Sequence, residues 1–342
     1  MTTLHRTFST WTARIAGTVL VTILLLAVFG GAIAPDDPLG QNPNDTFVHA
    51  GNAAHLLGTD YVGRDVLSRI LAGAGASVLL ALAMVGVGLM LGALPGVLSV
   101  FAGRATEFAL QRFTDALMTL PPIVFAIAVA GLFANGQLGA IVAIGVLLAP
   151  LFFRVARAET LGYAHTQYVE AAQLLGASRW WIVRRHIARK VVPTIAVTTA
   201  TATGYAVLAA ASLGFLGLGV QAPNPTWGGM LAANVQHLAD DAWAPIWPGL
   251  FIALTAWSLN ALADALRDGL SVGSQVLSPA AQAEASFGFT EPELVLEEPA
   301  ASTAGTPTGA EAAALDGAEG PGDPDPLTKR AAPARVEVGH AR

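Results

Sequence analysis

The sequence predicts an all-α integral membrane protein with six transmembrane helices and a disordered C-terminal tail. Of its 342 residues, 54% are hydrophobic and only 12% are charged, whereas about a quarter of the residues in a soluble domain are charged. Charge-free runs recur along residues 1–272, and each is long enough to cross the hydrocarbon core, which takes about 20 helical residues. These runs are Ile15–Pro35, Ile70–Gly103, Ala116–Phe153, Val191–Ala239 and Ala242–Ala263.

The runs divide into six helices as follows. Residues 15–35 exceed the apolar core of a signal peptide, so we expect a retained first helix. Residues 36–75 then form a segment outside the membrane, and residues 76–272 hold the other five helices. The third run is interrupted by the turn signal Asn135-Gly136-Gln137 and therefore supplies two helices. Pro121-Pro122 is expected to bend or break the first of these two. The fourth run ends in a loop rich in Gly and Pro and supplies one helix.

Basic residues set the predicted orientation, because lysine and arginine on short loops mark the cytoplasmic side. They precede the first run, separate the second from the third, and cluster between the fourth and fifth helices, whereas residues 36–69 are more acidic than basic. Residues 1–14 and the tail, residues 273–342, are therefore expected in the cytoplasm. The tail carries 11 acids against 4 bases and is rich in Pro and Gly, so it cannot bury enough apolar surface to order itself.

A basic cytoplasmic loop at about residues 157–193 is the most polar part of the membrane region. Tyr168–Leu175 favour a helix, Gly176 suits the left-handed position that ends one, and Ser178 can cap a second helix. One face of this second helix is expected to carry Trp180, Val183, Ile187 and Val191. Such a loop either rests on anionic lipid or binds a partner, and these residues alone leave both interpretations open.

Close helix packing is predicted where Gly88, Gly92 and Gly96 repeat at four-residue spacing, because glycine lets a second helix approach the backbone. The other interpretation is that glycine is simply frequent in this composition, which holds 36 of them.

Several kinds of chemistry are not expected. The chain has no cysteine for a disulfide, a thiol nucleophile or a metal site, and we interpret His49 and His55 as ordinary loop residues. Neither of its two lysines, Lys190 and Lys329, follows a glycine, so the phosphate-binding loop of an ATPase is missing. We therefore expect no enzymatic activity, no cofactor, no metal and no nucleic-acid partner. An ion-coupled secondary transporter remains the alternative from another class, although Glu107, Asp115, Glu159 and Asp264 all lie near expected helix ends rather than at mid-membrane depth.

Three stretches resemble permeases of binding-protein-dependent ABC importers. Glu170-Ala171-Ala172, followed by Gly176 and a basic helix that reaches Pro193, is similar to the family's EAA loop. His55–Val78 resembles the segment before the second span in the dipeptide, oligopeptide and nickel subfamily. Ala211–Leu231 and Asn260–Leu270 resemble the fifth-to-sixth loop and the end of the last span of that subfamily's second permease. The chain departs from the family at Arg189, where relatives commonly carry proline, and in its long acidic tail.

The resemblance implies a multi-pass permease of the bacterial inner membrane with type I ABC importer architecture. It implies a homologous permease as partner, two cytoplasmic ATPase subunits, an extracytoplasmic binding protein and contact with membrane lipid. It also implies that di- or oligopeptides are the substrate, with a nickel-chelate or other small-solute importer as the alternative. Residues Gln221, Asn224, Trp227 and Asn234 are candidates for external contacts, with an ordinary role in turns as the default. The residues implied to couple the chain to the ATPase are Glu170, Ala171, Ala172, Gly176, Arg179, Arg184 and Arg185.

Overall fold

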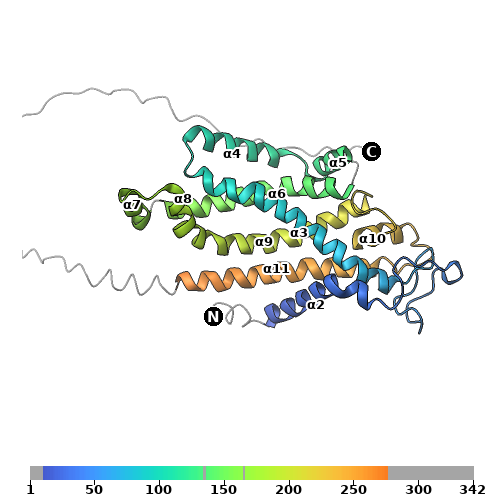
Figure 1. Cartoon of the computed structure of the whole chain (residues 1–342). Coiled ribbons are helices and arrows are strands. Elements are labelled where there is room, and N and C mark those ends of the chain that lie inside the picture. Colours follow the sequence, from blue (N-terminus) through green and yellow to red (C-terminus); the bar gives the residue numbers. More distant parts are fainter. Residues whose placement is uncertain (1–10, 134–135, 165, 276–342) are drawn as a thin grey trace, which may run out of the picture. The chain divides into compact units, whose positions relative to one another are not determined.

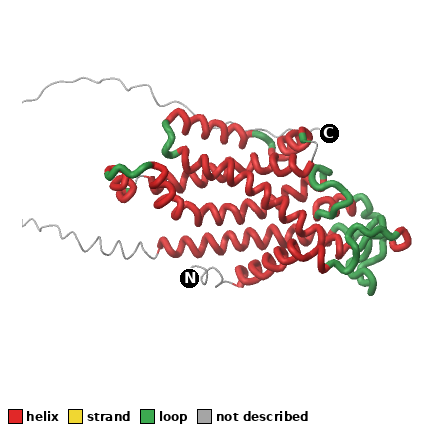
Figure 2. The backbone as a smooth tube through the Cα atoms, viewed as in Figure 1, coloured by secondary structure: helices red, strands yellow, loops and turns green. Residues whose placement is uncertain are grey.

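The structure, a computed structural model, describes residues 11–133, 136–164 and 166–275, with side chains described up to residue 270. In this part of the chain every regular element is a helix (Figures 1 and 2), and one isolated bridge joins Thr59 to Asp65. The prediction of an all-α membrane protein is confirmed. From residue 276 onward, the tail predicted to be disordered lies outside the described residues.

The helices and short helical turns follow one another along the chain with these bounds. They are α2 (Trp11–Ile33), η1 (Pro43–Asp45), α3 (Val66–Ser99), α4 (Arg104–Thr119), α5 (Pro122–Leu132), α6 (Gly136–Ala164), α7 (Gln167–Leu174), α8 (Arg179–Ile182), η2 (Val183–Ile187), α9 (Ala188–Phe215), α10 (Trp227–Val235) and α11 (Ile246–Gln275).

Five helical runs are long and apolar enough to span a membrane: α2, α3, α6, the continuous run Arg179–Phe215, and α11 up to Leu270. Helices α4 and α5 together are also apolar enough to span a membrane, but they meet at 98°, so they make the sixth span only if the bent pair is counted as one. The break lies at the two prolines. Leu120 is extended, as a residue before proline prefers, and Pro122 takes the first position of α5, where no backbone N–H is needed. The turn predicted before α6 includes Asn135, which lies outside the described residues.

The start of α3 is set by Asp65. This helix begins at Val66, inside the range 36–75 that was expected outside the membrane, because Asp65 caps its first turn. In the sequence, the charge of Arg69 sets the N-terminal limit of the charge-free run that begins at Ile70. In the structure its guanidinium is buried and lies 3.7 Å from the carboxylate of Asp60. A hydropathy pattern registers the charge of Arg69 and not the partner that offsets it.

The core forms where α3 packs along α6, and the three glycines lie in this contact. A Cβ atom at Gly88 would come within 2.7 Å of the Leu148 Cβ, and one at Gly96 within 2.6 Å of the Phe153 carbonyl oxygen. Gly92 lies against the carbonyl oxygen of Ala149. The two backbones therefore approach too closely for any side chain at these positions.

Helix α4 is held on α6 by two ion pairs. Arg157 pairs with Glu107, and both side chains are about one-quarter exposed. Arg154 pairs with Asp115 at 2.7 Å, with both side chains about half exposed. The acids of α4 are thus used in contacts between helices.

Helix α10 is fixed to α3 by a buried tryptophan. The Trp227 indole N–H donates to the carbonyl of Ile70 at 3.1 Å, and its backbone N–H donates to the Ser77 hydroxyl at 3.0 Å. The buried Asn234 amide donates to the carbonyl of Ala244 at 2.9 Å. The hypothesis that Trp227 and Asn234 contact an external partner is therefore wrong, because their polar groups are occupied within the chain.

Candidate partner-binding loop

The loop between α6 and α9 begins with the short helix α7, which ends at a glycine in the left-handed conformation. Gly176 has φ +82°. Its N–H donates to the carbonyl of Gln173 at 3.0 Å, and the N–H of Ala177 donates to that of Ala172 at 3.0 Å. These two bonds form a Schellman motif, in which the last carbonyls of a helix are satisfied as the chain turns away. The predicted end of the helix at Gly176 is confirmed.

The second half of the loop is a helix that runs without interruption into the membrane. Ser178 caps it by accepting a hydrogen bond from the N–H of Trp181 at 3.3 Å, as predicted. The run continues from Arg179 to Phe215. Arg189 stands where relatives commonly carry proline, so its N–H is available to a helix that a proline would interrupt.

One face of this second helix differs from the prediction. Val183, Ile187 and Val191 are buried as expected, but Trp180 is 59% exposed, and Ile182 is buried in its place. The cause is η2, a π-helical turn at Val183–Ile187. A π turn inserts an extra residue into the helix, so it rotates the preceding turn relative to the faces that a 3.6-residue period predicts.

A small apolar cluster supports α7. Val169 of α7 is fully buried against Ile182 and Ile187, and Phe101, just after α3, packs against the same cluster. The Arg179 guanidinium adds a hydrogen bond to the carbonyl of Phe101 at 2.6 Å. The loop is therefore tied to the end of α3 by both apolar and polar contacts.

The outer surface of α7 combines an acid with two leucines that the described part of the chain leaves exposed. Glu170 and Ala171 are exposed, whereas Ala172 is partly buried against the supporting cluster. Leu174 is 90% exposed and Leu175 is 89% exposed. Sequence reasoning missed these leucines, because their exposure depends on the turn at Gly176 that leaves them at the tip of the loop. Two adjacent apolar side chains this exposed form an apolar patch of the kind found where a protein binds a partner or a membrane surface.

Basic side chains follow α7 in the chain, in η2 and the first turn of α9. Arg184, Arg185, Arg189 and Lys190 are all exposed, and within the described residues none of them pairs with a carboxylate. Of the residues expected to contact a partner, Glu170, Ala171, Arg184 and Arg185 are therefore accessible. Ala172 and Arg179 instead hold the loop in place.

The loop and the segment between α2 and α3 lie at opposite ends of the bundle (Figure 1). The segment leads into the first residue of α3, and the loop contacts Phe101 just beyond its last residue. With 34 residues, α3 is about 51 Å long, which exceeds the roughly 30 Å of a hydrocarbon core.

Residues 84–271 match the family model described as "Binding-protein-dependent transport system inner membrane component". Over 250 residues, 73% of this chain and 84% of the relative, the chain is 36% identical to a probable D,D-dipeptide transport system permease of Escherichia coli K12. It is 34% identical to a glutathione transport system permease of Pectobacterium atrosepticum, over 75% of this chain and 85% of the relative. It is 33% identical to a di/tripeptide transport system permease of Pseudomonas aeruginosa, over 73% and 84%.

Proposed function

Because the chain belongs to the family of inner-membrane components of binding-protein-dependent transport systems, we propose that it is the membrane-spanning permease subunit of an ATP-driven peptide importer. The relatives above are named for D,D-dipeptides, glutathione and di- or tripeptides, which share a short peptide backbone. A di- or oligopeptide delivered by an extracytoplasmic binding protein is therefore the proposed substrate. The family model falls within residues 76–272, which we assign as the permease core.

The observation that carries this proposal is the uncovered surface of α7 on a fixed support. We assign Glu170, Ala171, Leu174 and Leu175 as the surface that docks on an ATPase subunit. A short helix that presents apolar side chains is suited to a groove in a partner. Arg184 and Arg185 add positive charge beside it, which favours an acidic rim on that partner.

The proposed orientation follows from charge. The loop carries Arg179, Arg184, Arg185, Arg189 and Lys190, so the positive-inside rule places it in the cytoplasm, where ATP is present. Both termini are then cytoplasmic, and the segment between α2 and α3 faces the binding protein on the other side.

A second, homologous permease is proposed because α9 has a polar face that the other described residues leave at least partly exposed. Thr194, Thr198, Thr201, Tyr205 and Ser212 follow one another at helical spacing, and each is exposed or partly exposed. The hydroxyls of Thr198, Thr201 and Ser212 donate to carbonyls of their own helix and keep free acceptor capacity. Polar groups in a membrane helix usually face protein or a water-filled path rather than lipid. We place this face toward the partner permease and the peptide pathway between the two.

The test replaces both exposed leucines, Leu174→Ser and Leu175→Ser, in the assembled transporter. The matched control is Leu56→Ser, which changes a 63% exposed leucine in the segment at the other end of the bundle. Co-purification of the ATPase subunits and binding-protein-stimulated ATP hydrolysis are measured in nanodiscs. We expect a loss of about 10-fold or more in ATPase-subunit affinity, because burying two leucines is worth roughly 3 kcal/mol or more, while the control keeps the wild-type affinity for the ATPase subunits.

A second variant, Gly176→Ala, tests the turn rather than the surface. Alanine at φ +82° costs about 1–2 kcal/mol, so we expect weaker coupling with the chain still inserted. Unchanged ATPase binding and hydrolysis in the leucine double variant would mean that the loop rests on lipid, and the docking assignment would then be wrong.

A further inference from the structure

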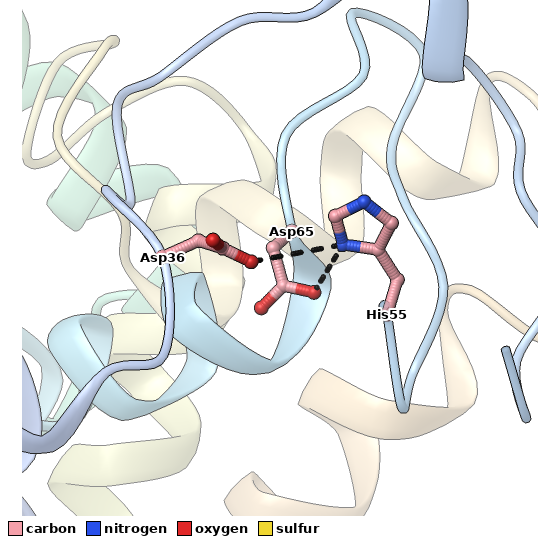
Figure 3. A group of neighbouring side chains, drawn as sticks. All are labelled: Asp36, His55 and Asp65. Carbon is pink, nitrogen blue, oxygen red and sulfur yellow. Dashed lines mark hydrogen bonds and ion pairs between the residues drawn. The ribbon is translucent and has the colours of Figure 1, made fainter. Parts of the chain in front are cut away.

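Three side chains of the types that bind metals converge in the segment between α2 and α3 (Figure 3). The Nδ1 atom of His55 lies 3.0 Å from Oδ1 of Asp65 and 3.8 Å from Oδ2 of Asp36. The three ligand atoms all lie within 4.8 Å of one another. The residues are 19 and 10 positions apart in the sequence, so no local spacing indicates the group.

Contacts around the group fix two of its members. Oδ2 of Asp65 accepts hydrogen bonds from the backbone N–H and the hydroxyl of Ser68, both at 2.7 Å, which leaves Oδ1 directed at His55. The same Ser68 hydroxyl accepts from the backbone N–H of Asp36 at 3.0 Å. Asp65 is buried, and the carboxylate of Asp36 is about half exposed. Hydrogen bonds of this kind orient the ligands of protein metal sites.

A single proton on Nδ1 of His55 can be donated in a hydrogen bond to only one of the two carboxylates that face it. When Nδ1 carries a proton, Asp65 at 3.0 Å accepts it, and 3.8 Å is too long for a hydrogen bond to Asp36. The half-exposed carboxylate of Asp36 then faces the same nitrogen without a hydrogen bond from it. A divalent cation in place of the proton would bind all three atoms and offset both negative charges.

We propose that Asp36, His55 and Asp65 form a binding site for a divalent transition-metal ion of the Zn²⁺ type. Tetrahedral Zn²⁺ bonds nitrogen and oxygen at about 2.0–2.2 Å, which sets ligand atoms roughly 3.3–3.6 Å apart. The distances from His55 Nδ1 to Asp65 Oδ1, 3.0 Å, and to Asp36 Oδ2, 3.8 Å, lie just below and just above this range. Imidazole with two carboxylates suits Zn²⁺ better than Ca²⁺ or Mg²⁺, which prefer oxygen ligands alone. The exposed side of Asp36 leaves the fourth position to water.

The bound ion would join two parts of the chain that are otherwise held by weaker contacts. Asp36 follows the end of α2, and Asp65 is the N-cap of α3. The site does not depend on the proposed transport function, because its ligands lie at the end of the bundle opposite to the α7 loop.

The test measures Zn²⁺ binding by isothermal titration calorimetry on the full chain in nanodiscs, purified through a tag without histidine and stripped with chelator. Asp36→Asn is the deciding variant, because its side chain is half exposed and caps no helix. His55→Asn removes the nitrogen ligand. The control is His49→Asn, an exposed histidine of the same segment outside the group.

We expect one equivalent of Zn²⁺ to bind the wild type and the control equally. Affinity should fall at least roughly 10-fold in Asp36→Asn and in His55→Asn, since even groups that only orient a ligand are worth that much. The proposal is overturned if Zn²⁺ shows no saturable binding, or if Asp36→Asn binds as the wild type does. In either case His55 only supports the helix cap through its hydrogen bond to Asp65.

Discussion

Replacing Gly92 by alanine tests the contact between α3 and α6. The new Cβ would lie 2.8 Å from the Cβ of Phe152 and closer still to the carbonyl oxygen of Ala149. Ordinary contact begins at 3.4 Å, so the helices must separate by at least 0.6 Å (3.4 minus 2.8). Backbone cannot rotate away as a side chain can, and overpacking of this kind costs about 1–3 kcal/mol.

The control is Gly86→Ala in the same helix, where an added Cβ meets nothing within 4 Å. Both substitutions gain the same helix propensity, about 1 kcal/mol, so the difference between them isolates the clash. Thermal unfolding in detergent, followed by tryptophan fluorescence, should place Gly92→Ala below Gly86→Ala by roughly 2–4 °C for each kcal/mol. Gly88→Ala should lie between them. Equal midpoints for Gly92→Ala and Gly86→Ala would refute the close approach of the two helices.

Two further outcomes are expected in the same thermal assay. Glu107→Gln should destabilise the chain more than Asp115→Asn, because the ion pair of Glu107 with Arg157 is less exposed than that of Asp115 with Arg154. Exposed ion pairs contribute only about 0–1 kcal/mol to stability. A larger loss of stability in Asp115→Asn would contradict this reasoning. Trp227→Phe keeps an aromatic ring but removes the N–H donated to the Ile70 carbonyl and leaves part of the buried indole volume empty. We expect a loss of more than about 1 kcal/mol, from the bond and the cavity together, and faster hydrogen exchange in α10; unchanged exchange would show that Trp227 does not hold this helix.

Local rules predicted the parts of the structure that depend on neighbouring residues. The charge-free runs located the spans, the proline pair located the break before α5, and Gly176 and Ser178 located the end of one helix and the start of the next. Each of these depends on backbone preferences or hydropathy within a few residues, which a sequence displays directly.

Other features depend on contacts that a local pattern does not display. The charge of Arg69 is offset by Asp60, and Arg179 is held by a carbonyl 78 residues away. Trp180 was placed on the wrong face because a π turn follows it, whereas the prediction of a helix face assumes a constant 3.6 residues per turn. In the candidate loop, the sequence indicated Glu170 but could not show which neighbouring leucines stay uncovered.

Helix α3 has a mechanical consequence for the whole chain. At one end of α3, the N-cap Asp65 bonds His55 of the segment between α2 and α3. At the other end, Phe101 contacts the α7 loop. Its single internal proline, Pro95, lies near the loop end, so residues 66–94 form one uninterrupted rod. A helix resists axial compression, because each turn is closed by its own hydrogen bonds. A push on the loop that shifted α3 along its axis would therefore move the residues around Asp65, at the opposite end of the bundle, by a similar distance without any change in the helix itself.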